Sequence, residues 1–149
     1  GYYVTMAADR SLGNDYYATY YSEDLENWTP ITLPDYFCTN LTCSFWTRDG
    51  KGYYAKGGEM MATLDGGETF QDIVVPGAEE ITGELGFDPF DTVEKMYEKD
   101  GTLYLVMGQG DDGDYMKDGK LSEALYRSED GVNFSFVEET ADDTPEQAG

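Results

Sequence analysis

Histidine is absent from this chain of 149 residues, and lysine and arginine together number nine against 31 acidic residues. Without histidine the chain lacks the usual general base near neutral pH and the commonest metal ligand. The formal charge of −22 and the lack of a basic stripe exclude nucleic acid as a partner. No apolar run approaches the roughly 18 residues of a transmembrane helix, so we expect no membrane span.

Cysteine is scarce, and both residues, Cys38 and Cys43, flank the short segment 39–42. A disulfide closing this loop is one interpretation. It indicates an oxidising compartment and an extracellular or secreted protein. Two free buried thiols are the alternative.

A short motif is present in three copies, at 22–28, 63–70 and 128–134. Each copy has a serine or threonine, an aspartate two residues later, a turn and then an aromatic residue. The hydroxyl and the carboxylate can accept hydrogen bonds from backbone N–H groups of a tight turn, and the ring can pack beneath it. We predict structural roles for Ser22, Asp24 and Trp28, for Thr63, Asp65, Gly67 and Phe70, and for Ser128, Asp130 and Phe134.

Runs rich in apolar, β-prone residues surround each motif. Two precede it (2–7 and 16–21; 52–56 and 59–62; 102–107 and 121–126), and one follows it (29–33, 71–75 and 134–137). The second and third repeats also have a leading run, at 41–47 and 92–98, which ends at Asp49-Gly50 or Asp100-Gly101, a strong hairpin signal. The predicted unit is therefore four antiparallel strands with the motif between the third and the fourth, which is typical of a propeller blade.

No segment shows a helical period, so 76–91 and 108–120 are expected to be loops. The predicted units are blade 1 at about 2–34, blade 2 at about 40–76 and blade 3 at about 90–138. The polar residues 139–149 form an acidic tail.

The second motif, Thr63-Leu64-Asp65-Gly66-Gly67-Glu68-Thr69-Phe70, resembles the Asp-box (BNR repeat) of sialidase-like propellers throughout its length. The other two are one residue shorter between aspartate and aromatic. The first, Ser22-Glu23-Asp24-Leu25-Glu26-Asn27-Trp28, is also similar to a turn of furanosidase-type glycoside hydrolases. The resemblance covers about residues 2–138 and implies an all-β fold of consecutive four-stranded antiparallel blades of a sialidase-like β-propeller. It also implies that the motif is a structural turn away from the axial site.

The same resemblance raises a glycosidase hypothesis. A sialidase-type site needs three arginines, and this chain has Arg10, Arg48 and Arg127, which its strand order places apart. Candidate carboxylates for acid/base work are Asp88, Asp91 and Glu94, near the expected axis. A solvated acidic loop is the alternative interpretation of these three.

Other residues are candidates for binding. Arg10, Arg48, Trp46 and Tyr54 can contact a glycan, although aromatic residues in strands more often pack in a core. The acidic loop with Asp111, Asp112, Asp114 and Asp118 is a candidate Ca²⁺ site, with a solvated hairpin loop as the alternative. No other cofactor is expected.

Fewer than three complete blades are predicted, whereas closed propellers use about four to eight. The chain is therefore part of a longer protein, a homodimer that closes a six-bladed ring, or a smaller arrangement of strands. The function predicted from these patterns is a secreted, non-catalytic binding or scaffold module for a glycan or a protein ligand. A glycoside hydrolase, or a fragment of one, and a self-associating structural protein are the alternatives.

Overall fold

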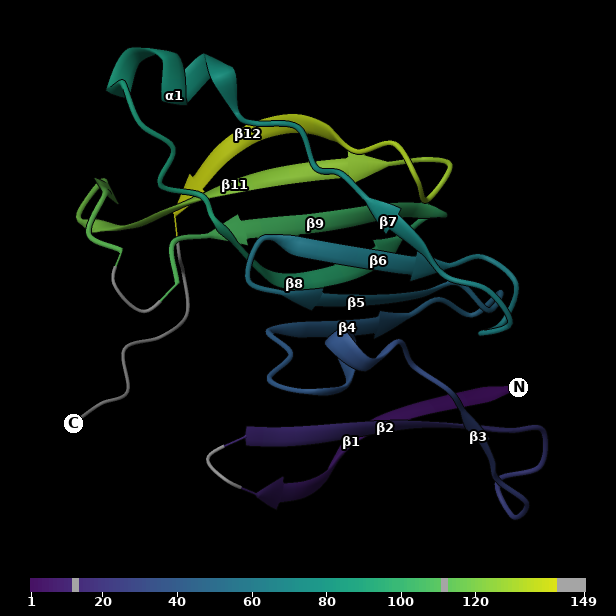
Figure 1. The fold of residues 1–149 in the computed structure, drawn as a ribbon. Coiled ribbons are helices and arrows are strands. Elements are labelled where there is room, and N and C mark those ends of the chain that lie inside the picture. The colour runs from purple at the N-terminus through teal and green to yellow at the C-terminus, as the bar shows by residue number, and fades with distance from the viewer. Residues whose placement is uncertain (12–13, 111–112, 142–149) are drawn as a thin grey trace.

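A computed structural model of the chain describes residues 1–11, 14–110 and 113–141. This part of the chain is mostly β-structure in antiparallel sheets, none of them closed, which confirms the all-β prediction. Three sheets follow one another in chain order and are stacked face to face (Figure 1).

Sheet 1 consists of β1 (Tyr2–Ser11), β2 (Asn14–Ser22) and β3 (Thr29–Ile31), paired in that order. Sheet 2 consists of β4 (Cys43–Trp46), β5 (Gly52–Lys56), β6 (Glu59–Thr63) and β7 (Gln71–Ile73), again in sequence order. Every one of these strands overlaps a run that the sequence predicts, and sheet 1 has three strands, as its missing leading run implies.

Sheet 3 contains β8 (Thr92–Lys99), β9 (Thr102–Gly108), β11 (Lys120–Ser128) and β12 (Ser135–Ala141), which pair in the order β8-β9-β11-β12. A two-residue strand, β10 (Met116–Lys117), also pairs with β11 and was not predicted. β12 continues to Ala141, so the first residues of the predicted acidic tail belong to the sheet. Residues 142–149 lie outside the described part.

Two short helices correct the expectation that the chain has none. α1 (Glu79–Leu85) lies in the predicted loop between sheets 2 and 3, and the 3₁₀ helix η1 (Asp35–Cys38) lies between sheets 1 and 2. α1 has acidic residues in its first turn, which suit the positive end of a helix dipole. It ends at Gly86, whose φ of 78° and N–H bond to Thr82 O form a left-handed cap. At seven residues it is too short to show a period.

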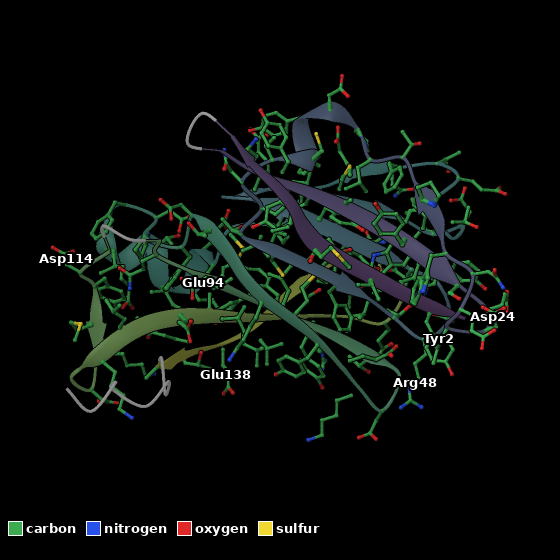
Figure 2. The ribbon with its side chains drawn as sticks, turned by 90° about the horizontal axis from the view of Figure 1, so that it is seen from below. Tyr2, Asp24, Arg48, Glu94, Asp114 and Glu138 are labelled. Atoms are coloured by element: carbon green, nitrogen blue, oxygen red, sulfur yellow. The ribbon has the colours of Figure 1, made fainter. Side chains whose placement is uncertain are left out.

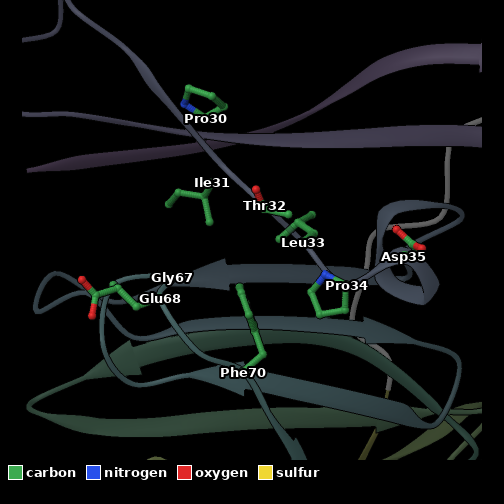
Figure 3. A pocket seen from close by; sticks show the side chains of 10 residues that line it. Pro30, Ile31, Thr32, Leu33, Pro34, Asp35, Gly67, Glu68 and Phe70 are labelled. Atoms are coloured by element: carbon green, nitrogen blue, oxygen red, sulfur yellow. The ribbon is translucent and has the colours of Figure 1, made fainter.

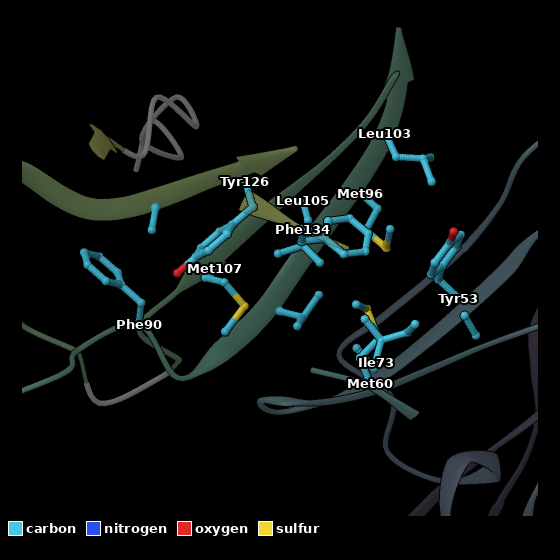
Figure 4. Close-up of a cluster of buried hydrophobic side chains, with 14 of the residues drawn as sticks. Tyr53, Met60, Ile73, Phe90, Met96, Leu103, Leu105, Met107, Tyr126 and Phe134 are labelled. Atoms are coloured by element: carbon cyan, nitrogen blue, oxygen red, sulfur yellow. The ribbon is translucent and has the colours of Figure 1, made fainter. Parts of the chain in front are cut away.

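Both faces of sheet 2 are buried, because neighbouring residues on a strand point to opposite faces. Tyr53 and Ala55 of β5 belong to the core cluster that sheet 2 shares with sheet 3, whereas Tyr54 between them faces sheet 1. The larger cluster combines Met60 and Ile73 of sheet 2 with Met96, Leu103, Leu105, Met107, Tyr126 and Phe134 (Figure 4). Full burial of one such side chain contributes about 1.5–3 kcal/mol to folding.

The three motifs occupy equivalent places in the three sheets. They connect β2 to β3, β6 to β7 and β11 to β12, and all three lie at the same end of the stack, on the right in Figure 1. We call them corner 1 (22–28), corner 2 (63–70) and corner 3 (128–134).

Candidate functional site

Corner 2 is closed by its own side chains. Thr63 Oγ1 accepts the N–H of Gly67 (2.9 Å), and Asp65 Oδ1 accepts the N–H groups of Glu68 (3.0 Å) and Thr69 (2.9 Å). The second carboxylate oxygen accepts the hydroxyl of Thr69 at 2.5 Å. The hydroxyl and carboxylate therefore satisfy the backbone donors of the turn, as the motif predicts.

The other two corners repeat this pattern. The serine accepts the N–H three residues on, the aspartate Oδ1 accepts the next two N–H groups, and its Oδ2 accepts an asparagine side chain. The bonds in corner 1 are Leu25 N to Ser22 Oγ (2.8 Å), Glu26 N and Asn27 N to Asp24 Oδ1 (2.9 and 2.8 Å) and Asn27 Nδ2 to Asp24 Oδ2 (2.8 Å). Those in corner 3 are Gly131 N to Ser128 Oγ (2.9 Å), Val132 N and Asn133 N to Asp130 Oδ1 (2.8 and 2.8 Å) and Asn133 Nδ2 to Asp130 Oδ2 (2.7 Å).

These bonds hold the pKa of all three corner carboxyls well below the ordinary range. The backbone N–H of Asn27 is the largest cause for Asp24, the Thr69 hydroxyl for Asp65, and the backbone N–H of Asn133 for Asp130. A carboxylate that accepts several hydrogen bonds keeps its charge and binds a proton poorly. The corner aspartates are thus suited to fixing a turn and unsuited to acid/base work.

The three candidate carboxylates near the expected axis have different surroundings. Asp88 Oδ1 accepts the N–H of Phe90 at 2.9 Å, and burial together with the Asp88 charge raises the pKa of Tyr126, a residue of the core, to about 12. Glu94 is the extra residue of a bulge in β8, and its carboxylate lies over Gly108, on the opposite face of sheet 3 from the core-facing Met107. Asp91 Oδ1 accepts the hydroxyl of its neighbour Thr92.

The three arginines are also separated. Arg10 is paired with Asp15 at the far end of β1, whereas Arg48 lies in the exposed β4–β5 turn, where Gly50 is close to the Tyr3 hydroxyl at the beginning of β1. The seven residues from Tyr3 to Arg10 along β1 span about 23 Å, so Arg10 and Arg48 lie far apart. Arg127 lies on β11 in sheet 3. The side chain of Arg10 is outside the described part of the chain.

The aromatic candidates Trp46 and Tyr54 belong to a buried network between sheets 1 and 2. Tyr54 is 0% exposed, and its hydroxyl accepts the indole N–H of Trp46 at 2.8 Å. Thr5 and Thr19 of sheet 1 also bond to this hydroxyl, Thr5 at 3.0 Å. The ring of Trp46 stacks on Tyr3, with centroids 3.9 Å apart. Both aromatics therefore contact sheet 1 from sheet 2. The ring of Tyr54 is closed to a ligand, and the half-buried ring of Trp46 is stacked against Tyr3.

Cys38 and Cys43 are separate free thiols in the structure, so the predicted disulfide is not formed. Cys38 ends η1 and packs against the cluster on the sheet 1 side, with its Sγ bonded to Asp35 O at 2.9 Å. Cys43 begins β4 and packs against the other cluster, where burial raises its pKa to about 11. The two side chains thus face opposite sides of sheet 2, which the spacing alone cannot reveal.

The predicted Ca²⁺ loop is described only in part. Asp111 and Asp112 lie outside the described residues. Asp114 and Asp118 are exposed, and Asp114 lies at the opposite end of the molecule from Asp24 (Figure 2). Within 1–11, 14–110 and 113–141, no group of three or more cysteine, aspartate or glutamate side chains is placed to hold a metal ion.

A cleft of about 780 Å³ lies between sheet 1 and corner 2 (Figure 3). One wall is the segment that leaves sheet 1, and the other is the turn of sheet 2. Gly67, at a φ of 102°, lies so close to Ile31 that a Cβ there would be 2.7 Å from Ile31 Cγ2. The lining residues are Pro30, Ile31, Thr32, Leu33, Pro34, Asp35, Gly66, Gly67, Glu68 and Phe70.

The cleft combines an apolar floor with polar groups that include two acids. Leu33 and Phe70 form a hydrophobic floor, whereas the exposed carboxylates of Asp35 and Glu68 are acceptors at its rim. No lysine or arginine is among its lining residues. Sequence reasoning missed this cleft because its walls come from two repeats. The only local signal is the pair Pro30 and Pro34, which limits regular structure after corner 1.

No family model, curated protein or solved structure matches this chain. In the described ranges, no helix has the length and apolar character needed to cross a bilayer.

Proposed function

We propose that this chain is a non-catalytic binding or scaffold module built from blades of a sialidase-like β-propeller, and that it binds neutral carbohydrate. The observation that carries the propeller part is the repetition of one corner. The same hydroxyl and carboxylate bonds close the turn before the last strand of each sheet, and the sheets stack in chain order. A repeated turn on stacked antiparallel sheets is the pattern of a blade array.

The non-catalytic part is supported by where the candidate catalytic groups lie. Asp88 and Glu94 are on opposite sides of sheet 3, and the corner aspartates are occupied by their own turns. Arg10 and Arg48 are at opposite ends of β1. A glycosidase needs two carboxylates that flank one scissile bond, and Asp88 and Glu94 are not placed as such a pair.

The cleft between sheet 1 and corner 2 supports the choice of ligand. Its volume of about 780 Å³ lies within the range of small-molecule sites, which combine an apolar lining with a few polar groups. The C–H faces of a sugar can pack on Leu33 and Phe70, and its hydroxyls can donate to Asp35 and Glu68 in charge-assisted bonds. An anionic sugar is disfavoured because the cleft has no cationic side chain and the chain's net charge is −22.

A glycan array that contains neutral and sialylated sugars tests this function. We expect saturable binding of a neutral glycan without turnover. Calorimetry of the best neutral glycan should show affinity reduced by about tenfold or more in the double variant Asp35→Asn/Glu68→Gln, because two charged acceptors become neutral. Glu80→Gln, which is exposed on α1 outside the cleft, is the matched control and should bind as the parent does.

Three results would contradict the proposal. They are selective binding of sialylated glycans, equal affinity of the double variant and the parent, and hydrolysis of sialyl or arabinofuranosyl chromogenic substrates. Selective binding of a lysine-rich peptide in the cleft would contradict the carbohydrate proposal and indicate a protein ligand.

A further inference from the structure

One tyrosine position recurs in all three sheets. Each corner begins with a serine or threonine, and the residue just before it in the sequence pairs with a tyrosine on the neighbouring strand. The three pairs are Tyr3 with Tyr21, Tyr53 with Ala62, and Tyr104 with Arg127. Because the register is the same, these tyrosines are structurally equivalent and point to the same face of their sheets.

Two of these tyrosines contact the following sheet at its corner. Tyr3 stacks on Trp46 of sheet 2, and its hydroxyl lies 3.3 Å from where a Cβ of Gly66 would be. Tyr53 donates a hydrogen bond of 2.6 Å to Gly131 O in corner 3. The third, Tyr104, stacks on Tyr97 at 5.1 Å on the open face of sheet 3, where the described chain has no further sheet.

The aromatic residues of the corners identify the face of each sheet that contacts the preceding sheet. Phe70 packs in the cluster on the sheet 1 side of its sheet, and Phe134 lies 6.3 Å from Tyr53 of sheet 2, so each faces the preceding sheet. Their equivalent in sheet 1 is Trp28, which is 40% exposed. It lines an apolar groove of about 250 Å³ with Val4, Met6 and Tyr20. Sheet 1 therefore has a receiving face without a preceding sheet among the described residues.

Charged side chains also lie on or beside the two open faces. The register of β8, β9, β11 and β12 places Lys95, Lys99 and Arg127 on the same face of sheet 3 as Tyr97 and Tyr104, together with Glu123 and Glu138, and the Glu94 carboxylate lies over Gly108 on this face. Corner 1, beside the receiving face, carries Glu23, Asp24 and Glu26 and no base. Inside the chain, sheet 2 already places a base on an acidic corner, because Lys51 Nζ lies 3.5 Å from where a Cβ of Gly131 would be.

We propose that a second copy of this chain covers the receiving face. The open face of sheet 3 in one copy docks on the open face of sheet 1 in the other, and the reciprocal contact closes a pair of chains with six stacked sheets. A sugar is a poor occupant of the groove because Val4, Met6, Tyr20 and Trp28 offer it almost no polar partner. At corner 1 the incoming Tyr104 meets Leu25, which is 55% exposed and replaces the glycine of the other corners.

Sedimentation equilibrium at physiological ionic strength tests this arrangement. We expect the parent to have twice the chain mass of 16.6 kDa. Met6→Glu on sheet 1 and Tyr97→Glu on sheet 3 should each weaken dimerisation about tenfold or more, because each buries a charge in an apolar contact. Val74→Glu, at an apolar position 82% exposed and outside both faces, is the matched control and should remain dimeric. Circular dichroism checks that each variant is folded.

A mixture of the two interface variants gives the sharper result. In a head-to-tail contact, Met6→Glu leaves the sheet 3 face unchanged and Tyr97→Glu leaves the sheet 1 face unchanged. A mixed pair therefore has one contact without a substitution, and the mixture should form dimers that neither variant forms alone. If Met6→Glu does not fold, Arg127→Glu tests the sheet 3 face and should also weaken the parent dimer.

Four outcomes would overturn the proposal. They are a parent that is monomeric at every concentration, a Tyr97→Glu variant that still dimerises, a mass that grows beyond two chains with concentration, and loss of the dimer in Val74→Glu. The glycan cleft plays no part in these measurements, so a failed dimer and a failed carbohydrate site are distinguishable.

Discussion

The hydroxyl of Tyr53 in sheet 2 donates a hydrogen bond of 2.6 Å to the carbonyl oxygen of Gly131 in corner 3. The bond joins residues 78 positions apart and is buried between two sheets. The bond connects sheet 2 to corner 3, so its removal should weaken both the corner and the packing of sheet 2 on sheet 3.

Replacing Tyr53 with phenylalanine should lower the free energy of unfolding by about 1–3 kcal/mol, because the buried carbonyl of Gly131 loses its partner. Urea denaturation followed by circular dichroism measures the change. Tyr2→Phe removes a hydroxyl from a half-exposed ring and should change stability by less than about 0.5 kcal/mol. Equal stability of both variants and the parent would contradict the Tyr53–Gly131 contact.

Gly131→Ala should be more destabilising than Gly57→Ala. Both glycines have positive φ, 78° and 62°, so both substitutions carry the left-handed cost of about 1–2 kcal/mol. A Cβ on Gly131 would also lie 2.5 Å from the Tyr53 hydroxyl, whereas one on Gly57 would meet nothing within 4 Å. Urea denaturation should show an additional loss of about 1–3 kcal/mol for Gly131→Ala; equal losses would mean that corner 3 is not packed against Tyr53.

Stability should fall in acid because of the corner aspartates. Their pKa values are lower in the folded chain than the unfolded value near 4. Their contribution is therefore fully present above about pH 4 and is lost as the pH falls below it toward the folded pKa. The urea midpoint, measured from pH 6 downward, should fall less steeply in Asp65→Asn than in the parent. Asp72→Asn, an exposed residue on β7, is the control and should keep the parent's slope.

Alkylation of Cys43 should be slow in the folded protein, since burial raises the pKa of its thiol to about 11 and only the thiolate reacts. Iodoacetamide labelling of a Cys38→Ser variant, followed by mass spectrometry, should show a rate that rises about tenfold per pH unit below this value. Unfolding in urea should abolish the protection. A parent protein without free thiols in urea under non-reducing conditions would show instead that the disulfide forms.

The strands could be predicted because their signals are local. Asp100 and Gly101 both adopt positive φ, 53° and 81°, as a tight hairpin turn requires, and this pair marks the β8–β9 turn in the sequence. The corners are equally local, since Asp65 bonds within its own turn. α1 could not be predicted because it has only seven residues, too few to show a helical period. Its other signals, two glutamates at its start and Gly86 at its end, are weak by themselves.

The candidate site could not be predicted, because it depends on which sheet each residue faces. Tyr53 and Tyr54 are neighbours in sequence, yet one contacts corner 3 and the other is bonded to Trp46 on the sheet 1 side. Likewise, Cys38 and Cys43 pack on opposite sides of sheet 2. The cleft combines Leu33 of one repeat with Phe70 of the next, and no pattern within a single repeat indicates that contact.

The central claim is that equivalent tyrosines of successive sheets lie against the corner of the next sheet. Nuclear Overhauser effects in the isotope-labelled chain test it most directly. We predict cross-peaks from the Tyr3 ring to the Hα protons of Gly66 and from the Tyr53 ring to those of Gly131, which occupy about the place of a Cβ. A spectrum with intact strand pairing in β5 and β6 but with neither cross-peak would contradict the account.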